Sequence, residues 1–189
     1  MSREARIIPS QGYLHVICRA NNHKRILSAR RDCKAYYRLA RKIKIEEGIK
    51  IFHYCIMFTH VHFLVGVDEL SNLARFIKRL NLKYFHYYIN RKSYSGHLWH
   101  GRFKSYPIED DQYFLRCGKY IEMNPVRAGI VDSPEEYEFS SYQHYACGKE
   151  DRLVDEDLFY HSLGETDSVR QEAYRKMIIE EDLEKGVIL

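Results

Sequence analysis

The sequence predicts an α+β fold in which helices pack on an antiparallel sheet, with a helical extension at the C-terminal end. Four short runs rich in β-branched and aromatic residues, at 13–19, 51–57, 60–67 and 103–108, are typical of strands. Stretches with apolar residues at helical spacing separate these runs, in the order β-α-β-β-α-β-α. This order predicts an α+β sandwich of one sheet and its covering helices.

The first strand and the first helix come from the first quarter of the chain. Residues 13–19 are strand formers, and the polar stretch at 20–23 reads as a turn. Between Asp32 and Glu47, apolar residues recur at helical spacing with basic residues between them, and Gly48 is a suitable end for a helix. We therefore expect an amphipathic helix over 32–47.

Two neighbouring strands and a second helix follow. Only Phe58 and Thr59 separate the runs 51–57 and 60–67, which predicts adjacent antiparallel strands. Ser71 is expected to cap the next helix. Its core face would carry Leu73, Ile77, Leu80 and Tyr84, and its other side the basic residues Arg75, Lys78, Arg79 and Lys83.

The third helix is expected after a turn-rich connector, 93–101, and the strand 103–108. Asp110 or Asp111 can cap this helix, which runs through Tyr120. We expect the helix to end at Asn124, because the residue before a proline disfavours the helical region.

Charge divides the chain into two parts. Residues 1–149 carry 25 lysines and arginines against 14 acidic residues, whereas residues 150–189 carry 5 against 12. We therefore predict a main domain at 1–149 and an acidic helical extension at 150–189. A basic domain rich in aromatic residues suits a polyanionic partner. For the acidic end, a solvated helix is favoured over a segment that shields the basic surface.

Composition argues against several classes of protein. No apolar run approaches the roughly 18 to 20 residues that cross a bilayer, and the first residues lack an apolar signal-peptide core. The five cysteines form no CxxC pair, which favours reduced thiols over disulfides or structural zinc. We expect a cytoplasmic protein without a membrane partner.

His60 and His62 are the first candidates for chemistry. Alternate side chains of a strand share one face, so a His-x-His triplet presents two imidazoles side by side. Such a pair suits manganese or zinc, and magnesium or manganese where oxygen ligands complete the site. With ten histidines in the chain, a surface or core role remains the alternative.

Tyr120 and Asn124 are the second pair of candidates. A tyrosine can act as a covalent nucleophile, and a metal beside it can polarise a phosphate. Asn124 lies four residues later on the same helix face, so its amide oxygen can approach the same metal. The alternatives are a packing tyrosine, one of sixteen, and an asparagine that ends a helix.

Several segments together resemble one family. The run Tyr54 to Val65 resembles the strand pair of single-tyrosine, IS200-like transposases, whose Met-Pro-Asn-His-Val-His segment ends in two histidines. Here Phe58-Thr59 replaces Pro-Asn, which affects the turn and leaves the ligands intact. The segments Trp99 to Ser105, Tyr120 to Ile130 and Tyr137 to Tyr142 resemble the REP-associated subgroup, so the resemblance spans roughly residues 10 to 145.

This resemblance implies a ferredoxin-like catalytic domain that cleaves and rejoins single-stranded or hairpin DNA. A divalent cation, Mg²⁺ or Mn²⁺, would be held by His60, His62 and Asn124. Tyr120 would attack a phosphodiester and leave a 5′-phosphotyrosyl bond and a free 3′-hydroxyl. The REP-associated subgroup implies a monomer, and related enzymes imply the alternative of a dimer that shares active sites.

Basic and aromatic side chains are the candidates for holding the DNA. Cations neutralise phosphates regardless of base sequence, and aromatic rings stack on unpaired bases. The candidates are Arg75, Lys78, Arg79, Lys83, Trp99, Arg102 and Lys104. Three rival functions remain: a domesticated hairpin-binding protein that does not cleave, a hydrolytic metal-dependent phosphodiesterase, and an interaction module unrelated to nucleic acid.

Overall fold

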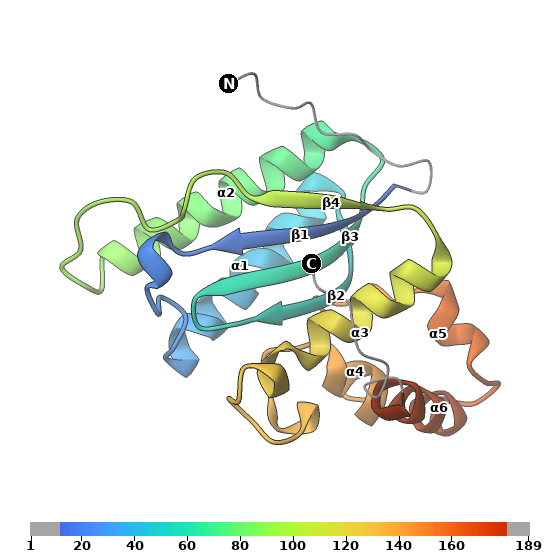
Figure 1. Cartoon of the computed structure of the whole chain (residues 1–189). Coiled ribbons are helices and arrows are strands. Elements are labelled where there is room, and N and C mark those ends of the chain that lie inside the picture. Colours follow the sequence, from blue (N-terminus) through green and yellow to red (C-terminus); the bar gives the residue numbers. More distant parts are fainter. Residues whose placement is uncertain (1–11, 181–189) are drawn as a thin grey trace.

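A four-stranded antiparallel sheet forms the centre of the molecule (Figure 1). The computed structural model describes residues 12–180. The strands, in the spatial order β2-β3-β1-β4, are β1 Tyr13–Arg19, β2 Lys50–Ile56, β3 His60–Gly66 and β4 Lys104–Ile108. With the two helices between them, they follow the β-α-β-β-α-β succession of the ferredoxin-like fold. The predicted fold class is confirmed.

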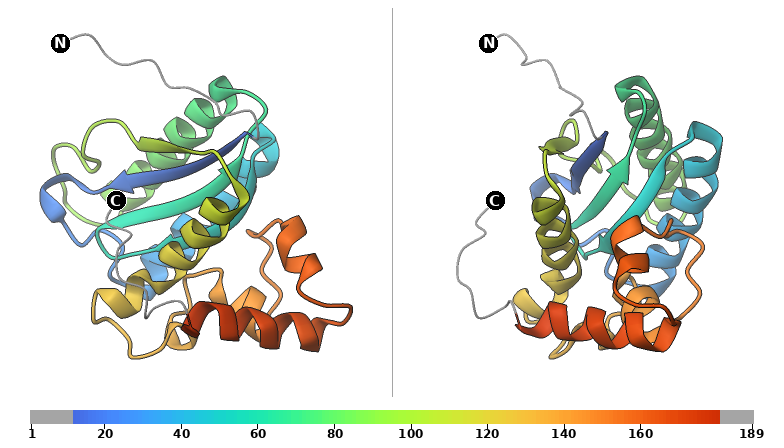
Figure 2. Two further views of the ribbon diagram at one scale, coloured as in Figure 1. Left: turned by 45° about the vertical axis from the view of Figure 1, so that its right-hand side comes forward. Right: turned by 90° about the vertical axis from the view of Figure 1, so that its right-hand side faces the viewer.

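Helices cover both faces of the sheet. Helices α1 (Arg30–Glu47) and α2 (Leu70–Ile89) pack together on one face, and α3 (Asp111–Arg127) lies on the other (Figure 2, right). The α1 and α2 side encloses the larger apolar core, to which β3 contributes Val61, Phe63 and Val65. Strands β1, β2 and β3 therefore contribute side chains both to this core and to the apolar cluster on the α3 side.

Two of the four predicted helix ends are confirmed, at Gly48 and Asp110. Gly48 ends α1 in the left-handed region at φ 63°, a conformation that costs glycine little. Asp110 caps α3 by accepting a hydrogen bond from the Tyr113 backbone N–H at 2.6 Å. The prediction for Ser71 is wrong: α2 begins at Leu70, with Glu69 at the cap position.

The prediction that the third helix ends at Asn124 is also wrong. Helix α3 continues through Pro125 to Arg127. Proline removes one backbone donor, and the Asn124 side chain stands in for it: its Nδ2 donates to the Tyr120 carbonyl at 2.7 Å and lies 3.5 Å from the Ile121 carbonyl, which proline leaves without an N–H. This local substitution lets the helix run one further turn.

Short helices complete the described chain beyond α3. Figure 1 shows α4 and α6 below α3, and α5 beside the N-terminal end of α3. These elements are the 3₁₀ turn η2 Pro134–Glu136 and the helices α4 Tyr142–Cys147, α5 Leu158–Ser162 and α6 Asp167–Glu180. Another 3₁₀ turn, η1 Asn21–His23, follows β1. Over residues 12–180, no helix is both long and apolar enough to cross a membrane.

A buried polar network joins these last helices to α3. Glu122 of α3 accepts hydrogen bonds from the Ser141 hydroxyl at 2.6 Å and the Tyr174 hydroxyl at 2.7 Å. Its carboxylate also lies 3.0 Å from Nδ1 of His53, whose Nε2 is 3.3 Å from Asp157. Burial alone would lower the pKa of His53, but the bonds to Asp157 and Glu122 raise it to about 9. This network, with a cationic histidine between two carboxylates, thus joins residues from five segments of the chain.

Helix α3 approaches β2 closely at Gly118. A Cβ atom there would lie 2.8 Å from Nε2 of the His53 ring, closer than packed atoms tolerate. Only glycine fits without moving the helix or the ring. The close approach of α3 to β2 therefore requires a glycine at this position.

Candidate active site

The two predicted histidines share the face of β3 that points toward α3. His60 and His62 alternate with Val61 and Phe63, which face the opposite core. Their ring centroids lie 4.9 Å apart and the ring planes are nearly perpendicular, at 79°. The alternation expected from the sequence is therefore confirmed in the structure.

Both rings are held through Nδ1. Nδ1 of His60 lies 2.9 Å from the Thr59 hydroxyl, and Nδ1 of His62 lies 2.9 Å from Nε2 of His15. Burial, helped by Arg19 and His23, lowers the pKa of His60 to about 4. Burial and the neighbouring His15 lower the pKa of His62 well below its usual value. Both imidazoles are neutral near pH 7, and neutral imidazole is the form that binds a metal.

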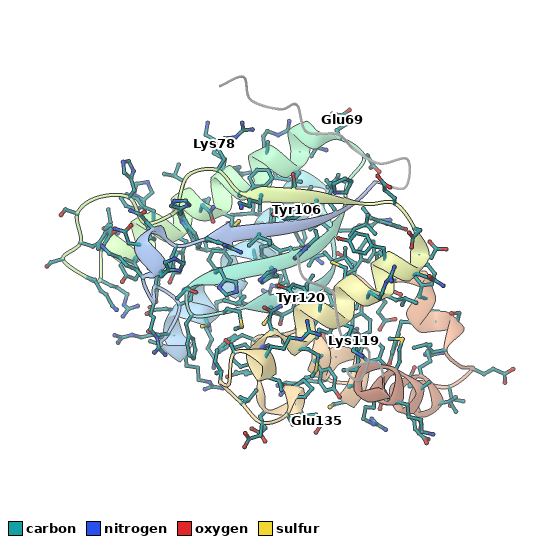
Figure 3. All side chains as sticks on the ribbon, viewed as in Figure 1. Glu69, Lys78, Tyr106, Lys119, Tyr120 and Glu135 are labelled. Carbon is teal, nitrogen blue, oxygen red and sulfur yellow. The ribbon has the colours of Figure 1, made fainter. Side chains whose placement is uncertain are left out.

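Tyr120 lies on α3 beside the sheet (Figure 3). Its ring centroid is 5.8 Å from that of His62 and 6.0 Å from that of His15, both edge-on. The Arg127 guanidinium carbon lies 5.3 Å from the centre of the Tyr120 ring. A half-buried tyrosine, a neutral histidine pair and a cation thus meet between the sheet and α3.

Asn124 lies one helical turn beyond Tyr120, as predicted. Its amide nitrogen is directed back along the helix to the Tyr120 carbonyl, so its amide oxygen is the atom suited to a cation. Within residues 12–180, no group of three or more histidine, cysteine, aspartate or glutamate side chains is arranged to hold a metal. The predicted ligand set differs from such a group because its third member is an amide.

His15 is a member of this site that the sequence reasoning missed. It lies on β1, has no exposed surface, and stacks on His62 with ring centroids 5.1 Å apart. Its signal in the sequence was a lone histidine inside the apolar run Leu14 to Ile17. Recognising its role requires the pairing of β1 with β3, which joins residues 47 positions apart.

A basic pocket adjoins the histidine pair. It lies beside His60 and is lined in addition by Arg19, His23, Thr59 and His100. None of the side chains around it is acidic within the described part of the chain. A pocket lined in this way suits an anion.

The predicted DNA-contacting residues lie in different places. Lys78, Trp99 and Arg102 line one largely apolar pocket between α2 and the connector 96–103. Trp99 is partly core, because it packs against Tyr36 and donates from Nε1 to the Asn81 carbonyl at 3.2 Å. Lys83 is exposed on α2.

Arg75 and Arg79 are tied into ion pairs. Arg75 Nε lies 2.9 Å from the Glu47 carboxylate, and Arg79 contacts both Glu46 and Glu47 at the end of α1. These pairs lie on the helical layer opposite Tyr120. The basic face expected for α2 is thus partly neutralised by α1.

Lys104 lies on the same side of the sheet as the site. On β4 it is opposite Ile17 of β1, which is in turn opposite His62 of β3. Directly paired residues of antiparallel strands point to the same face. The exposed Lys104 therefore extends the row of His62 toward the edge of the sheet.

Comparisons with known proteins identify a family and a similar fold. Residues 9–124 match the family described as "Transposase IS200 like". The fold is similar to a REP-associated tyrosine transposase solved with a REP hairpin, with a TM-score of 0.66 and 17% identity over 84% of this chain and 93% of that one. A candidate transposase from Deinococcus radiodurans R1 has a TM-score of 0.45 and 16% identity over 64% of this chain and 96% of that one. No curated protein matches. Because the family match spans more than half of the sequence, this chain belongs to the IS200-like transposase family.

Proposed function

We propose that this chain is a metal-dependent transposase that cleaves and rejoins single-stranded or hairpin DNA through a 5′-phosphotyrosine. The observation that carries the proposal is the contact of Tyr120 with His62 of the histidine pair, with ring centroids 5.8 Å apart. Family membership and the similarity to a transposase solved with a REP hairpin support it.

The donor set fits a divalent cation. His60 and His62 are neutral and held by their Nδ1 atoms, and where Nδ1 carries the hydrogen of the ring, Nε2 has a free lone pair that can bind a metal. Asn124 would add its amide oxygen. Two imidazoles and one amide suit Mn²⁺, and Mg²⁺ where phosphate and water oxygens complete the shell. A bound cation would polarise the scissile phosphate and stabilise the charge of the transition state.

Tyr120 would carry the covalent step. Its phenolic oxygen attacks the phosphorus and forms a new P–O bond, while the bond to the 3′-oxygen breaks. The tyrosine proton is released, and the departing 3′-oxygen takes up a proton to become a free hydroxyl. The phosphodiester is exchanged and not hydrolysed, so the 3′-hydroxyl can attack the phosphotyrosine and reverse the step.

The DNA would be held by the cations on the side of the sheet that carries Tyr120. Lys104, Arg127 and the pocket beside His60 all surround the site. Lys78, Arg102 and Trp99 would provide a second, partly apolar contact for the hairpin, with Lys83 nearby on α2. Arg75 and Arg79 would contribute less, because glutamates already neutralise them.

The arrangement supports a monomer over a dimer. Tyr120, His60 and His62 come together within one chain. A dimer with exchanged active sites would need α3 to leave its own sheet, and the Glu122 network and the tight contact at Gly118 oppose that movement.

The test is a denaturing gel of full-length protein incubated with labelled hairpin DNA and Mn²⁺. The wild type and Tyr106→Phe should form an adduct that survives denaturation, and Tyr120→Phe should form none. Tyr106 is a matched control because it lies on the same face, with its ring centroid 6.0 Å from that of His15. Cleavage without any adduct would favour the hydrolytic phosphodiesterase, and binding without cleavage would favour the domesticated DNA-binding protein.

A further inference from the structure

The contact between His15 and His62 is a second unusual feature of the α3 face of the sheet. Nε2 of His15 lies 2.9 Å from Nδ1 of His62, and the rings stack with an interplanar angle of 19°. Both side chains are buried, with 0% and 2% of their surface exposed. Two ring nitrogens at this distance share a single hydrogen, which belongs to one histidine or the other.

The two possible positions of that hydrogen have opposite consequences for His62. If His15 donates, Nδ1 of His62 is the acceptor and its hydrogen sits on Nε2, which then cannot bind a cation. If His62 donates, its Nε2 has a free lone pair. A metal-binding histidine is usually fixed in this second way, by an acceptor for its other N–H.

Packing alone does not account for a histidine at position 15. When His62 donates, His15 carries its own hydrogen on Nδ1, and this atom is buried without a hydrogen bond partner in the described part of the chain. An apolar side chain of similar size would fill the space without burying an unpaired polar atom. The role of His15 therefore lies in its other ring nitrogen, Nε2, which bonds to Nδ1 of His62.

We propose that His15 is a positioning residue that accepts the Nδ1–H of His62 and thereby keeps Nε2 of His62 available to the metal. This inference rests on the metal site proposed above, although the hydrogen bond itself exists without the metal. His15 holds the ring in its tautomer and orientation and does not touch the reacting atoms.

Three substitutions separate the effect of a hydrogen-bond acceptor at position 15 from the effect of filling the space there. His15→Gln places an amide oxygen near the position of Nε2 and keeps an acceptor for His62. His15→Asn places its amide near the position of Nδ1 and provides no acceptor there. His15→Leu fills the space and provides no polar atom.

The first readout is Mn²⁺ binding to the full-length protein without DNA, measured by calorimetry. We expect His15→Leu and His15→Asn to weaken binding by about 10- to 100-fold, and His15→Gln to stay within about threefold of wild type. Thermal unfolding should show that His15→Leu is folded and no less stable. Unchanged affinity in a folded His15→Leu variant, or equal losses in the leucine and glutamine variants, would overturn the proposal.

The second readout separates this inference from the metal site itself. Long-range ¹H–¹⁵N spectra of the metal-free wild type should show His62 with its hydrogen on Nδ1, and a hydrogen on Nε2 would overturn the role of His15. Equal Mn²⁺ affinity in wild type and His60→Ala would instead contradict the metal site. The spectrum of the wild type decides the question even where a variant does not fold.

Discussion

The two faces of β3 differ in what they do, although they belong to one strand of seven residues. Toward α1 and α2, Val61, Phe63 and Val65 are fully buried in a continuous apolar core. Toward α3, His60 and His62 meet Tyr120 and His15. The first face is apolar, whereas the second carries, besides the buried Leu64, polar groups that packing alone does not require.

We therefore expect stability and activity to depend on different residues of β3. Buried aliphatic and aromatic groups contribute transfer and packing free energy that no polar substitute supplies. Neutral buried imidazoles contribute little of that free energy and instead offer lone pairs. Substitutions of the apolar groups should therefore lower stability, and substitutions of the imidazoles should lower activity.

The largest contrast is expected between Phe63→Ala and His60→Ala. Phe63 is fully buried, and its truncation should lower the free energy of unfolding by about 3–5 kcal/mol. His60→Ala should change it by less than about 1 kcal/mol, yet reduce DNA cleavage to background. Denaturant unfolding and the cleavage assay, run on both variants, measure the contrast. A His60→Ala protein that cleaves as well as wild type would remove the functional distinction between the faces.

The contact of α3 with the sheet can be tested at Gly118. In Gly118→Ala the new Cβ would meet the His53 ring at 2.8 Å, so helix or ring must move. We expect a loss of about 1–3 kcal/mol in unfolding free energy. Cleavage should fall further, by about 100-fold if Tyr120 shifts by roughly 1 Å. The exposed Arg116→Ala on the same helix is the control, and equal activity of the two variants would show that α3 tolerates the displacement.

His53 and His62 differ in charge near pH 7, and the charge of His53 should make stability depend on pH. The pKa of His53 is raised to about 9 by Asp157 and Glu122 against the effect of burial, so His53 is cationic where His62 is neutral. A raised folded pKa stabilises the protein fully below the unfolded value near 6.5, and this contribution is lost as pH rises toward 9. Unfolding free energies between pH 6.5 and 9 should decline in wild type. The decline should be absent in His53→Gln, and equal slopes in both proteins would contradict the charged network.

The smallest effects are expected for surface cations. Lys104→Ala should reduce the slope of log affinity against log salt by about 1, because Lys104 extends the row of His62 toward the edge of the sheet, where it would contact a phosphate of the DNA. Arg79→Ala should leave the slope unchanged, since Glu46 and Glu47 already neutralise that arginine. Fluorescence anisotropy with labelled hairpin DNA at several salt concentrations measures both. A larger change in slope for Arg79→Ala than for Lys104→Ala would place the bound DNA on the α1 and α2 side of the sheet.

Local patterns in the sequence predict most of the fold and the position of the histidine pair. The alternation along 60–67 places His60 and His62 on one face, and Gly48 and Asp110 mark real helix ends. Contacts between distant segments are not local. The sequence pattern does not reveal that His15 meets His62, that Glu47 neutralises Arg75, or that Tyr174 binds Glu122.

Asn124 illustrates a local pattern with two readings. The residue before a proline usually leaves the helical region, which predicts an end of α3 there. The Asn124 amide instead donates to the carbonyls of the preceding turn, and the helix continues to Arg127. The general preference of residues before proline takes no account of a side chain that replaces the missing backbone donor.

The account depends most directly on which side chain becomes attached to DNA. Wild-type protein would be incubated with hairpin DNA and Mn²⁺, digested with nuclease and protease, and its peptides mapped by mass spectrometry. We predict a nucleotide attached through phosphate to Tyr120 and to no other tyrosine. Attachment at Tyr106 or another tyrosine, or cleaved DNA with no modified peptide, would contradict the central claim.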